Sequence, residues 1–176
     1  MTNSLQIRDA RDADRAAILA LTLSAYEQYA PVMGKMWKFY RANILSTIAD
    51  VKPAEQIVAE TANGIVGSVL LFPAGTHFRS PDGTSVTLPL PEIRLLAVAP
   101  SARGQGIGAA LTRECIRRAQ QSGVAAITLH TNDIMNVAMQ MYERMGFVRA
   151  PATDFTPAPG HIVKGYRFEL NHVAAG

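Results

Sequence analysis

Three glycines beside an arginine have the residue types of an anion-binding loop. Residues 103–108 read RGQGIG and stand between an apolar segment, residues 95–98, and a stretch with helical periodicity. The first backbone N–H groups of a helix have no acceptor within it, and the helix dipole places partial positive charge at that end. Glycine lets the backbone approach a ligand because no Cβ intervenes, and the Arg103 guanidinium has a planar fork of donors that suits phosphate. The spacing therefore predicts a phosphate-binding loop.

The glycine spacing separates this loop from two well-known phosphate loops. A dinucleotide-binding fold requires G-x-G-x-x-G and an acidic residue about 20 positions further on. The chain has G-x-G-x-G instead, and residues 124–129 contain no acid. The P-loop requires Gly-Lys followed by Ser or Thr, which is absent. For the glycines alone, a turn that merely ends a strand is the alternative.

Periodic patterns predict the elements that position this loop. Residues 95–98 have the length and composition of a buried strand. After the loop, apolar side chains recur every four residues with arginines on the other faces, which predicts an amphipathic helix. These apolar positions are Ile107, Leu111, Cys115 and Ala119.

The rest of the chain alternates strand and helix patterns. We expect strands over residues 5–8, 56–61, 65–72, 92–98, 126–130 and 163–170, another from residue 147, and helices over residues 12–30, 37–48 and 134–145. Asn63-Gly64 predicts a hairpin turn, Pro31 is expected to end the first helix, and Gly146 is expected to follow the last one. Early hairpins and later β-α-β crossovers imply an α/β (α+β) fold with a mixed sheet and helices on both faces.

Residues 73–91 differ in composition from their surroundings. They hold four prolines and the turn sequence Pro81-Asp82-Gly83. Residues 76–79 and 85–88 are predicted to pair across that turn as a hairpin arm. We expect this arm to be an excursion from a single domain over residues 1–176, and either to close an acceptor site or to pair between subunits of a homodimer.

Two motifs together resemble the GNAT superfamily of N-acetyltransferases. Arg103, Gly106 and Gly108 match its acetyl-CoA motif, (Q/R)-x-x-G-x-(G/A), and residues 142–147, YERMGF, match its second signature, Y-x-x-x-G-F. The second motif follows one strand and one helix after the first, as it does in the superfamily. The resemblance covers residues 91–147 and implies a GNAT-like fold with a mostly antiparallel central sheet and acetyl-CoA as co-substrate.

The implied reaction is attack of a neutral amine on a thioester, which needs a polarised carbonyl, removal of an amine proton and protonation of the thiolate. The resemblance makes Tyr142 the candidate general acid, because a phenol stays protonated at pH 7. The alternative for Tyr142 is an aromatic side chain packed on the sheet. The resemblance assigns acetyl-CoA binding to Leu96, Ala97, Val98, Arg103, Gly104, Gln105, Gly106, Ile107, Gly108, Ala109 and Ala138, with a backbone N–H of Ala97 or Val98 meeting the thioester oxygen.

Glu92 is the candidate base. It stands six residues before Val98, the offset at which histone-type members of the superfamily carry a base glutamate. Strand alternation puts it on the same face as Arg94, and its surroundings would have to raise its pKa for it to act as a base. A structural ion pair with Arg94 and deprotonation of the amine through water are the alternatives.

One position departs from the resemblance. Many members of the superfamily carry Asn seven residues before the tyrosine, where it contacts the pantetheine arm. Here that position is Met135, and Asn132 and Asn136 are out of register. The side-chain amide contact with the cofactor is therefore not predicted from this position.

Composition limits the classes of protein. The 176 residues, 48% hydrophobic and 18% charged, suit one soluble globular domain. No apolar run approaches 18 residues and the N-terminus has no apolar core, so neither a transmembrane helix nor a signal peptide is expected. A net charge of +3 favours a polyanionic cofactor but is too small to indicate nucleic acid. Cys115 is the only cysteine, which fits a cytoplasmic protein, and the four histidines lack metal-ligand spacing.

We therefore expect an N-acetyltransferase that transfers the acetyl group of acetyl-CoA directly to a small-molecule or peptide amine, without metal, nucleic acid or membrane. The alternatives are a non-catalytic acetyl-CoA-binding or sensing module, and transfer of a larger acyl group. We expect the acceptor to meet the first two helices, the 73–91 arm and residues 150–162. Met33, Met36, Trp37 and Tyr40 form a predicted cluster that belongs either to the core or to the acceptor pocket.

Overall fold

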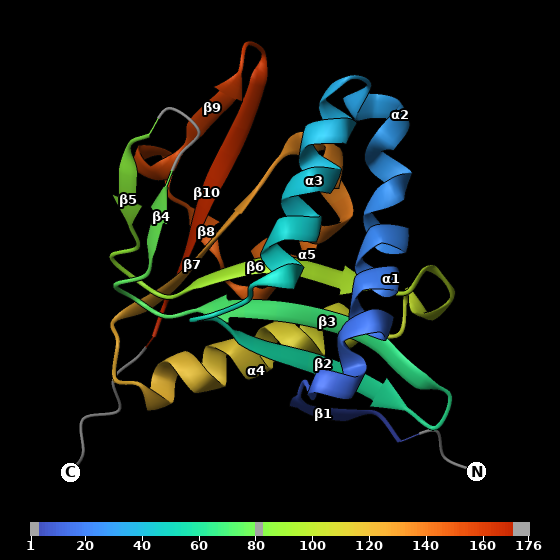
Figure 1. Ribbon diagram of the computed structural model, residues 1–176. Helices are drawn as coiled ribbons and strands as arrows, with labels where there is room; N and C mark the ends of the chain where they lie inside the picture. Colours follow the sequence, from blue (N-terminus) through green and yellow to red (C-terminus); the bar gives the residue numbers. More distant parts are fainter. Residues whose placement is uncertain (1–3, 80–82, 171–176) are drawn as a thin grey trace, which may run out of the picture. The chain divides into compact units, whose positions relative to one another are not determined.

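The computed structural model describes residues 4–79 and 83–170 (Figure 1). The chain forms two compact units. The first holds residues 4–70 and 95–114, and the second holds residues 71–94 and 115–170. Each unit contains its own part of the mixed sheet.

The first unit takes its strands from distant parts of the chain. In the order in which they neighbour one another, they are β1 (Gln6–Asp9), β2 (Glu55–Thr61), β3 (Gly64–Phe72) and β6 (Glu92–Val98), of which β3 and β6 also contribute residues to the second unit. β1 runs antiparallel to β2, with Ile7 opposite Ala59. Ile57 and Val58 are both fully buried. Because neighbouring strand residues point to opposite faces, β2 is covered on both faces.

Most helical segments of the first unit lie between β1 and β2 in the sequence. They are the 3-10 turn η1 (Asp12–Asp14), α1 (Arg15–Tyr26), the turn η2 (Glu27–Tyr29), α2 (Ala30–Met33) and α3 (Met36–Ala49). α1 buries the face that carries Ile18, Leu21, Thr22, Ala25 and Tyr26. It packs beside α3, which buries Ile44 and Ile48 (Figure 1).

The prediction that Pro31 ends the first helix is wrong. α1 already ends at Tyr26, and Pro31 lies in the first turn of α2. Proline is tolerated there because the N–H that it lacks would have no acceptor within the helix. The chain turns after Met33 instead, where Gly34 adopts a φ of +53°.

The helix that follows the glycine loop is α4 (Ile107–Gln121). All four apolar positions of its predicted face are buried, which confirms the periodicity. Its first turns approach β3 at Gly67, where an added Cβ would lie 2.9 Å from side-chain carbons of Ile107 and Leu111. A larger residue at this position would force the Ile107 and Leu111 side chains to shift, so glycine suits the close approach of the helix to the strand.

The second unit contains the start of β6 and the C-terminal strands. Its elements are β7 (Ala126–Thr131), the turn η4 (Asp133–Met135), α5 (Asn136–Met145), β8 (Val148–Arg149), the turn η5 (Pro151–Thr153), β9 (Phe155–Ala158) and β10 (His161–Glu169). β6 is parallel to β7, with Glu92 opposite Thr128, whereas β10 is antiparallel to β7, β8 and β9. Gly146 follows α5 with a φ of +102°, as predicted. The predicted mixed, mostly antiparallel sheet is confirmed.

The predicted arm is present in the second unit. β4 (His77–Arg79) and β5 (Ser85–Thr87) pair antiparallel as a separate two-stranded sheet. Phe78 stands opposite Val86. The predicted turn lies partly outside the described residues, since residues 81 and 82 fall there. Closure of an acceptor site and pairing between subunits stay predictions for this arm.

Candidate functional site

The glycine loop leads from β6 into α4 within the first unit. The 3-10 turn η3 (Pro100–Ala102) follows β6, and Gly104 and Gly106 then adopt φ values of +76° and +75°. This left-handed backbone favours glycine. A Cβ added at either position would meet no atom within 4 Å, so the loop faces open space. Open space beside a loop that leads into the N-terminus of α4 is compatible with the predicted cradle of backbone donors, and phosphate binding there stays a prediction.

Arg103 makes a contact that sequence reasoning missed. Its guanidinium donates hydrogen bonds to the backbone oxygen of Ala25 at 3.1 Å and to Oε1 of Gln28 at 3.3 Å. A cation at the C-terminal end of α1 satisfies a terminal carbonyl and complements the helix dipole. Since a guanidinium has five N–H donors, the same side chain retains donors for a phosphate. No local pattern signals this contact, because it joins residues far apart in the sequence.

The strand before the loop is distorted next to its predicted cofactor-binding residues. Leu95 adopts a φ of +49°, which costs about 1–3 kcal/mol for a residue with a side chain. The Tyr26 hydroxyl donates a hydrogen bond to the backbone oxygen of Leu96 at 3.0 Å. Ala97 is buried and Val98 half-buried. The end of α1 is therefore bonded both to this strand segment and to the phosphate loop.

Tyr26 also belongs to an aromatic cluster on α1, η2 and α3. The ring centroids of Tyr26 lie 6.0 Å from Tyr29 and 5.9 Å from Tyr40, and Tyr40 stacks on Trp37 at 6.3 Å. Burial raises the pKa of both Tyr29 and Tyr40, so their hydroxyls stay protonated at neutral pH. Trp37 and Tyr40, two of the four residues of the predicted cluster, are therefore in contact.

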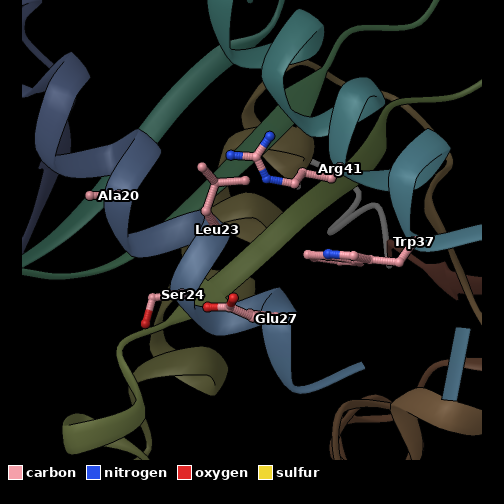
Figure 2. A pocket seen from close by; sticks show the side chains of 6 residues that line it. All are labelled: Ala20, Leu23, Ser24, Glu27, Trp37 and Arg41. Atoms are coloured by element: carbon pink, nitrogen blue, oxygen red, sulfur yellow. The ribbon is translucent and has the colours of Figure 1, made fainter. Parts of the chain in front are cut away.

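A cavity of about 310 Å³ opens beside this cluster, between α1 and α3 (Figure 2). Its lining residues are Ala20, Leu23, Ser24, Glu27, Trp37 and Arg41. Trp37 therefore stacks within the aromatic cluster and also lines the cavity. All four residues of the predicted cluster are half-buried, and Trp37 is the one that lines this cavity, so the choice between core and acceptor pocket stays a prediction.

In the second unit, Glu92 is the centre of a buried charged cluster. Its side chain is 4% exposed, and Arg94 Nε donates to Oε1 at 2.5 Å. His130 Nδ1 lies 3.1 Å from Oε2, and His130 Nε2 lies 2.9 Å from the backbone oxygen of Thr153. Both imidazole nitrogens face oxygen acceptors, which suits the doubly protonated ring. Glu92, Arg94 and His130 therefore form one ionic network.

This network sets the protonation of its members. Burial alone raises the pKa of Glu92, but the hydrogen bond from His130 and the charge of Arg94 outweigh it and leave the pKa below its ordinary value. Burial lowers the pKa of His130, but the hydrogen bond with Glu92, the negative charge of Glu92 and the hydrogen bond with the Thr153 backbone together outweigh it and leave the pKa raised. The pKa increase that a basic Glu92 requires is not found, and the ion pair with Arg94 is present. The role of His130 in this network was missed, although parallel pairing of β6 and β7 would have suggested it.

Tyr142 and Ala138 lie on α5. The Tyr142 side chain is buried, and its ring packs edge to face with Phe147 at a centroid distance of 5.7 Å. Ala138 is half-buried. Tyr142 is therefore a packed aromatic residue, and its role as a general acid stays a prediction.

The end of β7 carries two polar atoms that suit a ligand. Among the described residues, Thr131 Oγ1 and Asn132 Oδ1 are buried and have no hydrogen-bond partner. An unpaired buried oxygen costs about 1–3 kcal/mol, so a donor from a ligand would be stabilising there. Asn132, out of register in the sequence, therefore offers the kind of acceptor that Met135 lacks.

Two absences hold for residues 4–79 and 83–170. No group of three or more His, Cys, Asp or Glu side chains there is arranged to hold a metal ion. None of the helices there combines the length and apolarity needed to cross a membrane. His172, one of the four histidines considered from the sequence, lies outside the described residues.

Three of the known proteins that this chain matches differ in the extent of the match. N-acetyltransferase 8F1 of Rattus norvegicus is 33% identical over 121 residues, which covers 65% of this chain. The chain spans about half the length of that relative, 52%. A putative acetyltransferase of the GNAT family from Desulfovibrio desulfuricans has a TM-score of 0.69 at 16% identity, covering 96% of this chain and 100% of the other.

A third match is the crystal structure of a GNAT family acetyltransferase from Brucella melitensis in complex with acetyl-CoA. Its TM-score is 0.63 at 20% identity, and the match covers 97% of this chain and 90% of the other. At these identities the solved structures show a shared fold. The model of the acetyltransferase (GNAT) domain family matches residues 52–149, which are more than half of the chain. The chain therefore belongs to the GNAT acetyltransferase family.

Proposed function

We propose that this protein is an acetyl-CoA-dependent N-acetyltransferase that acetylates a primary amine by direct attack in a ternary complex. The observation that carries the proposal is the glycine loop. Gly104 and Gly106 hold left-handed conformations before the N-terminus of an α-helix, and their Cβ positions face open space. The acetyl-CoA bound to the Brucella melitensis relative and the name of the rat relative support it.

Residues of this chain fit the parts of acetyl-CoA. Residues 103–109 would hold the phosphates through backbone N–H groups and the Arg103 guanidinium. Residues 96–98 and Ala138 would accommodate the pantetheine arm, and Asn132 Oδ1 would accept a hydrogen bond from one of its amides. The backbone N–H of Ala97 or Val98 would stabilise the oxyanion. Acetyl-CoA supplies an activated acetyl group.

The reaction balances with few protein groups. The amine nitrogen forms a bond to the acetyl carbon, the carbon–sulfur bond breaks, the amine loses a proton and the thiolate gains one. Tyr142 would donate the thiolate's proton. The pKa of Glu92 lies below its ordinary value, so its carboxylate is a weaker base. This disfavours direct abstraction of the amine proton by Glu92. We propose that its negative charge acts on the amine proton through water.

Thiol release tests this proposal. Purified protein, acetyl-CoA and a broad panel of amines and peptides should release free CoA thiol with at least one acceptor, in equal amount to the acetylated product. Binding of acetyl-CoA without thiol release from any acceptor would favour the non-catalytic sensing module. We further propose that the protein acts in the cytoplasm, which its single buried cysteine supports.

A further inference from the structure

We infer that the cavity between α1 and α3 is the acceptor subsite and that it selects a free amino acid, a ligand that carries both an ammonium and a carboxylate. The inference rests on the proposed function, because it names the acceptor class of that same reaction. It is carried by two opposite charges and an aromatic ring that line one small cavity.

The charges come from two different helical segments. Glu27 begins η2 directly after α1, and Arg41 lies on α3. Figure 2 shows Glu27 and Leu23 on one side of the cavity and Arg41 and Trp37 on the other. Within residues 4–79 and 83–170, neither Glu27 nor Arg41 has an ion pair or a hydrogen bond of its side chain. Each charge is therefore available to a ligand.

The two charges match the two ends of an amino acid. A carboxylate accepts hydrogen bonds from an ammonium, and a guanidinium donates two parallel bonds to a carboxylate. The indole of Trp37 adds the aromatic face that attracts a cation most strongly. Leu23 and Ala20 supply apolar surface for a side chain. A peptide N-terminus or a lysine side chain would leave Arg41 without a partner, because neither carries an adjacent free carboxylate.

The size of the cavity agrees with a small ligand. Ligand pockets usually measure about 300–1,000 Å³, and this cavity, at about 310 Å³, is at the lower end. A free amino acid suits that volume better than a large antibiotic or a folded protein segment that must bury most of its surface.

The first unit also links this cavity to the predicted acetyl-CoA site. The two sequence neighbours of Glu27 are Tyr26, whose hydroxyl binds the backbone oxygen of Leu96, and Gln28, whose Oε1 accepts from Arg103. The segment that carries the carboxylate is therefore fixed to the strand before the loop and to the loop itself. An ammonium held at Glu27 would be presented from an element in direct contact with both.

The proposed step acetylates the α-amine of the bound amino acid. The ammonium first loses one proton to solvent. Its nitrogen then forms a bond to the acetyl carbon and gives up a second proton, the carbon–sulfur bond breaks, and the thiolate takes up a proton. The products are an N-acetyl amino acid and free CoA.

Arg41→Gln is the sharpest variant, because it removes the contact that only an amino acid needs. We would assay the proteinogenic L-amino acids, each beside its methyl ester and its decarboxylated amine, by thiol release, and measure their binding by calorimetry without acetyl-CoA. The wild type should use at least one amino acid with kcat/KM about tenfold or more above its ester and amine. Arg41→Gln should lower kcat/KM for that amino acid about tenfold. It should leave kcat/KM for the corresponding decarboxylated amine within about twofold of the wild-type value.

Matched variants control for the loss of charge. Glu27→Gln should lower kcat/KM for the amino acid and for the amine alike, because both acceptors carry the ammonium. Lys38→Gln removes an exposed positive charge from α3, and Asp50→Asn removes a negative charge at its end, without touching the cavity. Both should behave as the wild type, and all four variants should keep the wild-type melting temperature.

Each outcome decides a different claim. Equal use of amino acids, esters and amines, or an Arg41→Gln effect equal to that of Lys38→Gln, would overturn the inference while acetyl transfer to amines stands. Absence of thiol release with every amine would instead refute the proposed function. In that case calorimetry still tests whether the cavity binds a free amino acid. Amino-acid binding that requires Glu27 and Arg41 supports this subsite, and absence of such binding overturns it.

Discussion

The Tyr26 hydroxyl and the backbone oxygen of Leu96 are joined by a 3.0 Å hydrogen bond between residues 70 positions apart. Tyr26 is the last residue of α1, and Leu96 follows the left-handed Leu95 in β6. Two residues further along the helical segment, Gln28 accepts from Arg103 of the phosphate loop. The end of α1 is thus held by the two segments that the proposal assigns to acetyl-CoA.

Tyr26→Phe should destabilise the protein measurably. The substitution keeps the ring in its aromatic cluster and removes the donor to Leu96, which leaves a partly buried carbonyl with one bond fewer. The expected loss is about 1 kcal/mol in the free energy of unfolding. Urea denaturation measures it. Tyr29→Phe removes a hydroxyl from the same cluster and serves as the control, and equal stability of the two variants would argue against the importance of this bond.

Gly106→Glu should abolish acetyl-CoA binding. The new side chain would occupy the open space beside the loop and repel phosphate, and the left-handed φ adds strain. Acetyl-CoA at 100 times its dissociation constant should stabilise the wild type by about 2.7 kcal/mol and the variant not at all. Thermal unfolding with and without acetyl-CoA measures this difference.

Gly160→Glu is the matched control for that variant. Gly160 has a φ of +77° and an equally open Cβ position, but it lies in the turn between β9 and β10. It should show a similar loss of intrinsic stability and keep the stabilisation by acetyl-CoA. Loss of that stabilisation in both variants would attribute the effect to backbone strain in general.

The Glu92–His130 contact should make stability depend on pH in a defined direction. The pKa of His130 is raised in the folded state, so its contribution is fully present below the unfolded value of about 6.5 and is lost as pH rises through the folded pKa. The pKa of Glu92 is lowered, so its contribution is present above its unfolded value of about 4.3 and is lost as pH falls through the folded pKa. Both contributions coexist in the mildly acidic range.

His130→Gln should therefore remove the loss of folding stability that the wild type shows as pH rises through the folded pKa of His130. The difference in unfolding free energy between wild type and variant should be largest near about pH 5.5 and shrink as pH rises through the folded pKa of His130. Denaturant unfolding at a series of pH values measures it, with His161→Gln as a control for loss of a histidine. A constant difference at all pH values would show that the contact does not involve the charged imidazole.

Tyr142→Phe should separate catalysis from packing. The ring would keep its edge-to-face contact with Phe147, whereas the hydroxyl that we assign to the thiolate would be lost. Turnover should fall roughly 10²- to 10⁴-fold, while acetyl-CoA affinity and melting temperature should barely change. Steady-state kinetics with any acceptor that the wild type uses measures the effect. Wild-type turnover would leave Tyr142 as a packing residue and require solvent to protonate the thiolate.

Local patterns were enough to predict the loop and its helix. The fourfold repeat of apolar residues in α4 depends only on helical geometry, and the left-handed glycines of the loop depend only on backbone sterics. The same holds for Gly146 after α5 and for the pairing of β4 with β5. These features arise within short stretches of chain, and the mixed sheet follows from their order.

Contacts between distant segments could not be predicted in this way. The loop motif predicts a phosphate role for Arg103, but nothing in its sequence neighbourhood points to its additional hydrogen bond with the carbonyl of Ala25. Glu92 was read as a base that needed a raised pKa, but its pKa depends on His130, which belongs to another strand. The conformation of Leu95 likewise has no signal in a run of apolar strand residues. Side-chain chemistry at the site is therefore set by tertiary contacts more than by motif.

The most direct test of the central claim is the stoichiometry of acetyl transfer. Wild-type protein is incubated with acetyl-CoA and the panel of amines and amino acids, and free thiol and acetylated acceptor are quantified in the same reaction, by thiol titration and by mass spectrometry. We expect multiple turnovers with one acetylated acceptor for each CoA released, and neither product with Gly106→Glu. Saturable binding of acetyl-CoA with no acetylated product from any acceptor would contradict it.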